Sequence, residues 1–307
     1  GTPEGEDLIT PHSTDFHMKS SYYLTKKMIF ALPTKSAGPV FLVYRANPAV
    51  DGVLQEVAVG EPEIDVTAER DGVRHEIWRV DKAEQVTALT AAFDAMPAIY
   101  VADGHHRSAA GSRVGNARRE ANTQHTGDEG YNYFLSVIFP HDQMQILDYN
   151  RVVRDLNGLS NAEFLAAIGE SFDLEVSDGP VRPGRSGEFG MYLDRQWYRL
   201  RIHDDRVPAD DPVARLDVSV LQNNLIDPLL GVDDPRRDDR IDFVGGIRGL
   251  GELEKRVDSG DWAVAFALYP TTMQALMDVA DAGEVMPPKS TWFEPKLADG
   301  LVSHVLD

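Results

Sequence analysis

The chain has 307 residues, of which 42% are hydrophobic and 26% charged, and its formal net charge is −20. This length is enough for one large or two ordinary globular domains. A surface this acidic repels the phosphates of nucleic acid and argues against DNA contact. The absence of cysteine excludes disulfides, thiolate zinc sites and cysteine nucleophiles. No apolar run approaches the ~18 residues that a membrane span needs.

The start of the chain carries no charged and then apolar signal segment, and we expect a cytoplasmic protein. Because the chain begins with Gly1 rather than Met, we expect a processed or cloned fragment in which targeting information could be missing. The sequence leaves the oligomeric state open.

The first third of the chain is expected to form an extended lead over residues 1–37, followed by strands, turns and one helix. The predicted strands are the apolar run 38–44, Ile64 to Thr67 and the alternating segment Val73 to Val80. The predicted turns are Asn47-Pro48, Asp51-Gly52 and Asp71-Gly72. Asp81 is expected to cap an amphipathic helix in which Val86, Leu89, Phe93 and Met96 recur three and four residues apart.

The stretch from Ala98 to Gly111 predicts a buried strand, a tight turn at Asp103-Gly104 and the start of a helix. Residues 115–130 combine glycine and charge without apolar periodicity, and we expect a mobile loop there. The β-forming runs 131–140 and 144–153 are expected to pair as an antiparallel hairpin.

The second half repeats the mixture of helices and hairpins. One predicted helix starts at the capping box of Ser160 and a second at Asp217, which is expected to act as its cap. Two further helices are predicted over 250–257 and 271–282. A hairpin is expected to turn near Asp194-Arg195, with further strands at 241–244 and 262–269.

This pattern predicts an α+β or mixed α/β fold, with mixed sheets, antiparallel hairpins and flanking helices. We expect an anion- or nucleotide-binding region over 38–153 and an α/β region over 154–307, with a boundary near 154–160, or a single domain that includes both.

The Asp103-Gly-His-His-Arg stretch is the first candidate site. A helix start exposes unpaired backbone N–H groups and carries the positive end of the helix dipole, so it attracts anions. Gly104 allows the backbone to approach a ligand, and Arg107 can bind a phosphate through two hydrogen bonds. His105 and His106 are suited to bind an anion or to act as acid and base. The alternative is structural: Asp103 caps the helix and one histidine lies in the core.

Lys289-Ser290-Thr291 forms the second candidate site. These residues present an ammonium and two hydroxyls, groups that bind phosphates or help to hold Mg²⁺. A polar turn before the aromatic anchor Trp292-Phe293 is the equally weighted alternative. Glu76 and Glu294 are candidate bases that nothing local distinguishes from surface carboxylates. Zinc-ligand spacing, a G-x-S-x-G elbow and a G-x-G-x-x-G loop are all absent from the sequence.

At these stretches the chain resembles the prokaryotic domain-of-unknown-function family 1015, whose members are often described as ParB-like. The matching segments are Tyr100-Val-Ala-Asp-Gly-His-His-Arg, Asn150-Arg-Val-Val, Leu216-Asp-Val-Ser-Val-Leu, Met286-Pro-Pro-Lys-Ser-Thr-Trp-Phe-Glu-Pro-Lys-Leu and Gly300-Leu-Val. Asn150 stands where the family has histidine, and the family's N-terminal Pro-Tyr-Asp motif is absent.

The Asp-Gly-His-His-Arg turn is also similar to the phosphate-binding turn of the ParB/sulfiredoxin superfamily, which includes free-serine kinases. This resemblance implies a ParB/sulfiredoxin-like element around 73–115. It implies that Gly104, His105, His106, Arg107 and the adjacent Ser108 hold a nucleotide phosphate, with Asp103 near the metal or the transferred group. Sulfiredoxin chemistry itself is excluded, because its active cysteine has no counterpart here.

The function that we expect is nucleotide-dependent phosphotransfer to a small hydroxylated metabolite. A nucleoside triphosphate or diphosphate with Mg²⁺ would be the cofactor, and a phosphorylated small molecule the ligand. Asp103 or Glu76 would act as base or hold Mg²⁺, and His106 and Arg107 would face Lys289 across one cleft. The alternatives are a non-enzymatic ParB-like nucleotide-sensing or DNA-associated protein, and a metal-dependent hydrolase using His105 and His106.

Overall fold

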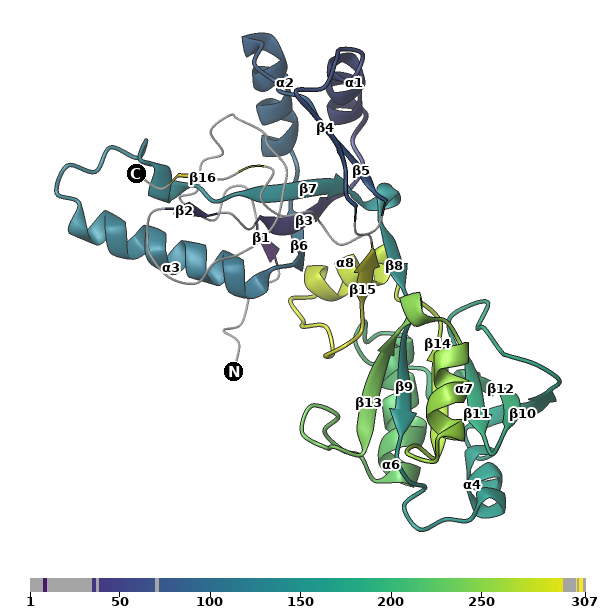
Figure 1. The fold of residues 1–307 in the computed structure, drawn as a ribbon. Coiled ribbons are helices and arrows are strands. Elements are labelled where there is room, and N and C mark those ends of the chain that lie inside the picture. The colour runs from purple at the N-terminus through teal and green to yellow at the C-terminus, as the bar shows by residue number, and fades with distance from the viewer. Residues whose placement is uncertain are drawn as a thin grey trace. The chain divides into compact units, whose positions relative to one another are not determined.

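The computed structural model describes residues 39–69 and 72–294, with short pieces at 8–9, 35–36, 302 and 304–305. The chain divides into two compact units, residues 1–144 with 295–307 and residues 145–294 (Figure 1). The division lies before residue 145, whereas sequence reasoning placed a boundary near 154–160. Most of the expected lead over residues 1–37 lies outside the described residues. Helices combine with one mixed and several antiparallel sheets, which confirms the predicted α+β class.

The first unit is built on a mixed sheet. In the described part of the unit its strands lie in the order β1 (Leu8–Ile9), β6 (Ile99–Asp103), β3 (Val40–Tyr44) and β7 (Ser136–Pro140). β3 runs parallel to β7 and antiparallel to β6. The whole of β3 is buried, as expected for a central strand with a continuous apolar sequence. The predicted strand at 38–44 is therefore confirmed.

Helices α1 (Pro48–Val57) and α2 (Ala83–Asp94) pack against each other in the first unit (Figure 1). Leu89 and Phe93 of α2 share one buried cluster with Val50 of α1 and with Leu42 and Tyr44 of β3. Strands β4 (Ile64–Thr67) and β5 (Arg74–Ile77) form a separate antiparallel hairpin. The amphipathic helix and the hairpin are thus where the sequence predicted them. A further short pair joins β16 (His304–Val305) to β2 (Lys35–Ser36).

The turns predicted at Asn47-Pro48 and Asp51-Gly52 are wrong, because Asn47 is the N-cap of α1 and the other three residues lie within this helix. The Asn47 side chain accepts a 2.9 Å hydrogen bond from the Ala49 backbone N–H and caps the helix. Pro48 is the first helical residue, where its missing N–H costs nothing. The expected cap of α2 is also wrong, since the cap residue is Lys82 and its side chain makes no capping hydrogen bond.

Helix α3 (His105–Ala121) corrects the expected mobile loop over 115–130. The helix includes Gly111 and Gly115, and it packs against the 3₁₀ turn Gly130–Asn132. Tertiary packing of this kind contributes more to helix stability than intrinsic propensity does. The connection that follows is closed around Glu129. This carboxylate accepts hydrogen bonds from the Thr126 backbone N–H at 2.6 Å, the Gly127 N–H at 3.0 Å and the Asn132 amide at 3.0 Å.

The second unit is built on an antiparallel sheet. Its strands lie in the order β10 (Phe172–Ser177), β12 (Gln196–Ile202), β11 (Glu188–Leu193), β14 (Val264–Leu268), β9 (Tyr149–Val153) and β13 (Ile241–Gly245). The predicted hairpin between β11 and β12 is confirmed. Asp194 and Arg195 turn it with φ angles of 49° and 61°, the left-handed pair that a tight hairpin requires.

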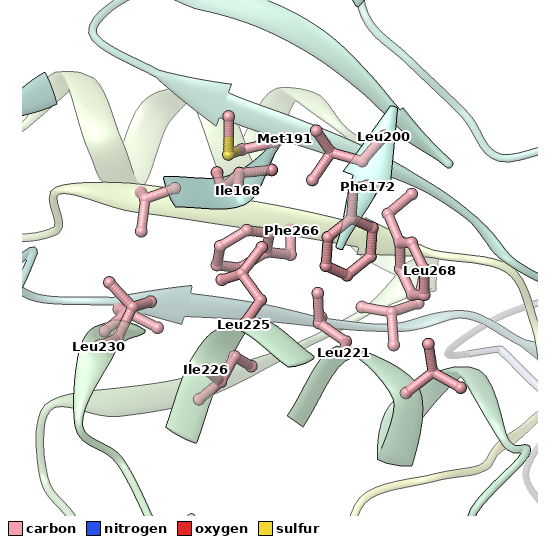
Figure 2. Packing of buried hydrophobic residues seen from close by; sticks show 14 of the residues in the cluster. Ile168, Phe172, Met191, Leu200, Leu221, Leu225, Ile226, Leu230, Phe266 and Leu268 are labelled. Carbon is pink, nitrogen blue, oxygen red and sulfur yellow. The ribbon is translucent and has the colours of Figure 1, made fainter. Parts of the chain in front are cut away.

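Both faces of this sheet are covered. On one face Phe172, Met191, Leu200 and Phe266 pack against helical residues that include Leu225 (Figure 2). The helical segments on this side are α4 (Asn161–Ile168), α5 (Asp217–Leu221), the π-helical turn Gln222–Ile226, α6 (Asp227–Leu230) and α8 (Met273–Asp281). Helix α7 (Gly251–Asp258) covers the opposite face.

The antiparallel hairpin predicted over 131–153 is wrong. β7 pairs in parallel with β3 in the first unit. β8 (Gln145–Leu147) pairs with β15 (Trp292–Glu294), and β9 lies between β13 and β14. Asp217 is not a helix cap either: it is the first residue of α5, and Leu216 holds the cap position. The capping box at Ser160 is confirmed.

The packing of Leu225 generates a stability prediction. Leu225 is fully buried in the large cluster of the second unit, so Leu225→Ala should lower the free energy of unfolding by about 2–5 kcal/mol. Val176→Ala on edge strand β10 is the control, because Val176 is 61% exposed and its loss should cost no more than about 0.5 kcal/mol. Urea unfolding followed by tryptophan fluorescence measures both. Equal midpoints for the two variants would contradict the packing described here.

The closed connection after α3 generates a pH prediction. Burial alone would raise the pKa of Glu129, but hydrogen bonds from Thr126 and Gly127 outweigh it and lower the pKa to about 2. The folded state therefore favours the charged carboxylate, and this contribution is complete above the ordinary pKa and lost as the pH falls towards 2. Glu129→Gln should be less thermostable than the wild type at neutral pH. The difference should narrow below about pH 4.5. Equal melting temperatures at neutral pH would rule out this role.

Candidate functional site

The turn between β6 and α3 is built around Gly104. Its backbone has a φ of 97°, in the left-handed region that glycine adopts without strain. A Cβ at this position would lie 3.2 Å from Nε of Arg107 and 3.4 Å from Cα of Val40. The turn therefore needs glycine twice, once for its backbone conformation and once to leave room for the arginine.

Arg107 folds back over this turn. Its guanidinium donates one hydrogen bond to the Pro39 carbonyl oxygen and one, of 3.0 Å, to the Asp103 carboxylate. The Arg107 side chain is 15% exposed, whereas that of Asp103 is 58% exposed. The arginine is thus held in place from two sides, while the carboxylate that pairs with it remains accessible to solvent.

The start of α3 follows directly. The backbone N–H groups of Arg107 and Ser108 donate to the Gly104 carbonyl oxygen at 2.8 and 2.9 Å. The helix geometry leaves the first N–H groups, including those of His105 and His106, without a partner inside the helix. The two histidine side chains lie outside the described part of the structure, and Ser108 is half-buried. The predicted strand, turn and helix are all present.

Glu76 lies on β5, in the two-stranded sheet with β4, and not in the sheet that carries the turn. It is exposed and forms an ion pair of 3.1 Å with Arg74. Glu294 is the last residue of β15, and its side chain lies outside the described part of the chain. The role of either acid as a base stays a prediction.

Lys289 is presented by a tight turn in the second unit. Its φ is 59°, and its ammonium lies 5.8 Å from the centre of the Tyr149 ring, a cation–π contact. Ser290 is 4% exposed, and its hydroxyl donates a 2.6 Å hydrogen bond to the Pro287 carbonyl oxygen. Ser290 therefore stabilises the turn, Lys289 is exposed, and Thr291 is half-buried beside them.

Tyr149, the aromatic partner of Lys289, belongs to a group of packed rings. Tyr149 packs edge-on against Trp292 at 5.3 Å and against Phe243 at 6.0 Å between ring centres. We refer to Tyr149, Phe243, Lys289 and Trp292 as the Tyr149 cluster. A Cβ at Gly245 would lie 2.7 Å from a ring carbon of Trp292, so glycine is needed there for the indole to pack against the strand.

Arg151 lies beside this cluster and was not identified from the sequence. It is 3% exposed, donates a 3.1 Å hydrogen bond to the Tyr149 carbonyl oxygen and lies 5.4 Å from the centre of the Phe243 ring. Its Nε has no hydrogen-bond partner among the described residues. Burial lowers the pKa of this guanidinium to about 10. A buried cation with an unused donor is suited to bind an anion.

Asp148 was also missed by sequence reasoning. It is 4% exposed and accepts hydrogen bonds from the Asn150 amide at 2.5 Å and from Arg182 at 3.3 Å. Its backbone carbonyl accepts a 2.7 Å hydrogen bond from the Gly246 N–H, which ties the β8–β9 connection to the end of β13. The signal available in the sequence was a run of polar residues, 148–151, inside a segment predicted as a strand.

The two candidate sites lie in different units, the Asp103–Arg107 turn in the first and Lys289 in the second. That they face one cleft stays a prediction. Among the described residues, no three acidic, histidine or cysteine side chains are grouped so as to hold a metal ion. None of the described helices has the length and apolar character required to cross a membrane.

A known protein family matches more than half of the chain. The model for the family described as "Protein of unknown function (DUF1015)" matches residues 31–219. The chain belongs to this family. None of the curated proteins matches it. The family assignment confirms the resemblance seen in the sequence, while the ParB/sulfiredoxin-like element around 73–115 stays a prediction.

Several solved structures are similar over most of the DUF1015 chain. A conserved hypothetical protein from Pyrococcus furiosus is 13% identical, with 85% of this chain and 91% of that chain covered and a TM-score of 0.35. A free serine kinase in complex with AMP is 12% identical, with 91% and 94% covered and a TM-score of 0.36. A mutant of a free serine kinase in complex with ADP is 14% identical, with 91% and 95% covered and a TM-score of 0.34.

The packing of Gly245 generates a prediction for the Tyr149 cluster. Gly245→Ala should push the Trp292 ring away from Tyr149 and lower stability by about 1–3 kcal/mol, as overpacking does. Gly251→Ala is the matched control, because a Cβ there meets no atom within 4 Å. Near-ultraviolet circular dichroism and thermal unfolding report the two effects. An unchanged aromatic spectrum in Gly245→Ala would contradict the described contact.

Proposed function

We propose that the chain binds the phosphates of a nucleotide at the turn between β6 and α3 and transfers a phosphoryl group to a small hydroxylated metabolite. The observation that carries this proposal is the placement of Arg107 over Gly104 at the start of a 17-residue helix. Three features suited to an anion coincide there: the unpaired N–H groups of a helix start, a backbone without a side chain, and a guanidinium held in place.

The geometry leaves Arg107 with donors to spare. A guanidinium has five N–H donors, and among the residues that the structure describes only Pro39 and Asp103 accept from this one, which uses two donors. A phosphate at the helix start can therefore be bound without breaking the contacts that hold the arginine in place. Lys289 is a further exposed cation that we assign to phosphate binding, with Ser290 stabilising its turn and Thr291 as an additional hydroxyl.

Asp103 is the group that we assign to the acceptor. Its carboxylate is exposed and fixed by Arg107, so it can accept the proton of a hydroxyl that attacks the transferred phosphorus atom. As an oxygen ligand it also fits Mg²⁺, which would neutralise charge on the nucleotide phosphates. His105 and His106 occupy the first turn of α3, and their backbone N–H groups are further hydrogen-bond donors for a phosphate at this site.

Nucleotide binding is tested by calorimetry with ATP, ADP and CTP in the presence of Mg²⁺. Arg107→Gln should weaken binding about tenfold or more, because it removes charge-assisted hydrogen bonds to phosphate. Arg113→Gln is the matched control: it removes the same charge from an exposed position on the same helix and should leave affinity nearly unchanged. Failure of all three nucleotides to bind, or equal affinity in Arg107→Gln, would contradict the phosphate site.

Phosphoryl transfer is tested separately, with radiolabelled ATP and a panel of small hydroxylated acceptors. Asp103→Asn keeps an acceptor for the Arg107 hydrogen bond but cannot take a proton, so kcat at saturating nucleotide should fall by about 10²–10⁴-fold. Nucleotide binding without transfer to any acceptor would refute the transferase role and favour nucleotide sensing. Unchanged turnover in Asp103→Asn would refute the role of this carboxylate.

A further inference from the structure

The second unit contains a cavity that the proposed function does not use. Its volume is about 660 Å³, within the range of small-molecule sites. It is lined by the loop before β11, the end of β12 and the start of α5. Ile202, Val207 and Val220 form its apolar wall. All of these residues belong to the second unit, so the cavity is independent of the β6–α3 turn.

Asp217 supplies a buried polar group at this cavity. One carboxylate oxygen, Oδ1, accepts a 2.7 Å hydrogen bond from the Ser186 hydroxyl and a 2.9 Å hydrogen bond from the Gly187 backbone N–H. The structure records no hydrogen bond to Oδ2 from any residue that it describes. Burial outweighs these two hydrogen bonds and raises the pKa of Asp217 to about 6. The carboxylate thus has one oxygen left to accept a hydrogen bond.

Cationic side chains also line the cavity. Arg185 is paired with Glu188 at 2.8 Å, and Arg215 is paired with Asp278 at 2.7 Å. Arg201 is the least engaged, because its recorded ion pair with Glu188 is 3.9 Å long and no hydrogen bond accompanies it in the described residues.

Two carboxylates and a histidine also line the cavity. Asp173 stands opposite Arg201 in the strand register and lies 3.4 Å from His203, and Asp204 is exposed to solvent. Of the three cavity arginines, Arg201 has the longest recorded ion pair, so it is the guanidinium best placed to receive an anion from outside the protein.

We propose that this cavity binds a small acid that also carries a hydroxyl or amino group. Its carboxylate or phosphate would pair with Arg201, its hydroxyl or amino group would donate to Oδ2 of Asp217, and its carbon chain would lie against Ile202 and Val220. A simple anion would pair with the arginine but would offer no hydrogen-bond donor to Oδ2 of Asp217. The cavity therefore selects for a ligand that carries both groups.

Calorimetry with the intact chain tests this proposal. The probes are glycerate, glycerol 3-phosphate and β-alanine, which separate the carboxylate from the phosphate and the hydroxyl from the amino group. Propionate and propyl phosphate, which lack the donor, are the ligand controls. At least one donor-bearing probe should bind at millimolar concentration or below, and the control of the same anion class should bind about tenfold more weakly or not at all.

Three variants test whether the probes bind in this cavity. Arg201→Gln and Asp217→Asn should each weaken the binding about tenfold or more; the second keeps an oxygen that accepts from Ser186 and Gly187. Arg199→Gln is the matched control, because Arg199 lies on the same strand and also pairs with Glu188, at 3.7 Å, but does not line the cavity. Circular dichroism verifies that each variant is folded.

The outcomes are distinct. Selective loss in Arg201→Gln and Asp217→Asn supports the site. The proposal is overturned if no probe binds the wild type, if propionate and propyl phosphate bind as tightly as the donor-bearing probes, or if Arg199→Gln weakens binding as much as Arg201→Gln. None of these outcomes depends on nucleotide binding in the first unit, so failure here and failure of the phosphotransferase proposal can be told apart.

Discussion

The left-handed backbone of Gly104 is the constraint on which the candidate phosphate site depends. It reverses the chain where β6 ends, so that α3 begins immediately and its first N–H groups lie next to the end of a buried strand. The missing side chain leaves the space that the Arg107 guanidinium occupies. Because Arg107 is also hydrogen-bonded to Pro39 and Asp103, groups of the protein itself hold the cation in place, and it loses little freedom when it binds an anion.

The second unit uses buried charge in three different ways. Asp148 is satisfied by Asn150 and Arg182 and stabilises the connection between β8 and β9. Arg151 is buried beside aromatic rings and keeps one donor unused, whereas Asp217 has hydrogen bonds recorded at only one of its two oxygens. Isolated charges are costly to bury, so the two incompletely satisfied groups are where a ligand can contribute most. The sheet provides the rigid support for both, since its two faces are covered by separate apolar clusters.

Local sequence patterns predicted those elements well whose structure depends on residues close to them in the sequence. The strand–turn–helix at Gly104, the capping box at Ser160 and the hairpin at Asp194-Arg195 depend on contacts within a few residues. Pairing over 131–153 could not be predicted from local patterns. β7 and β8 are adjacent in sequence, but each pairs with a strand more than ninety residues away along the chain, and the two partners belong to different units. Asn47-Pro48 was misassigned because the same dipeptide starts turns and helices. Arg151 and Asp217 were missed as sites because their burial depends on packing from distant segments.

The central claim is that the β6–α3 turn holds nucleotide phosphates, and a crystal structure of the chain grown with ADP tests it most directly. The account predicts phosphate oxygens within hydrogen-bond distance of the His105 or His106 backbone N–H and of the Arg107 guanidinium, with the backbone of Gly104 still left-handed. Phosphates bound elsewhere on the chain, with Arg107 still engaged only by Pro39 and Asp103, would contradict it.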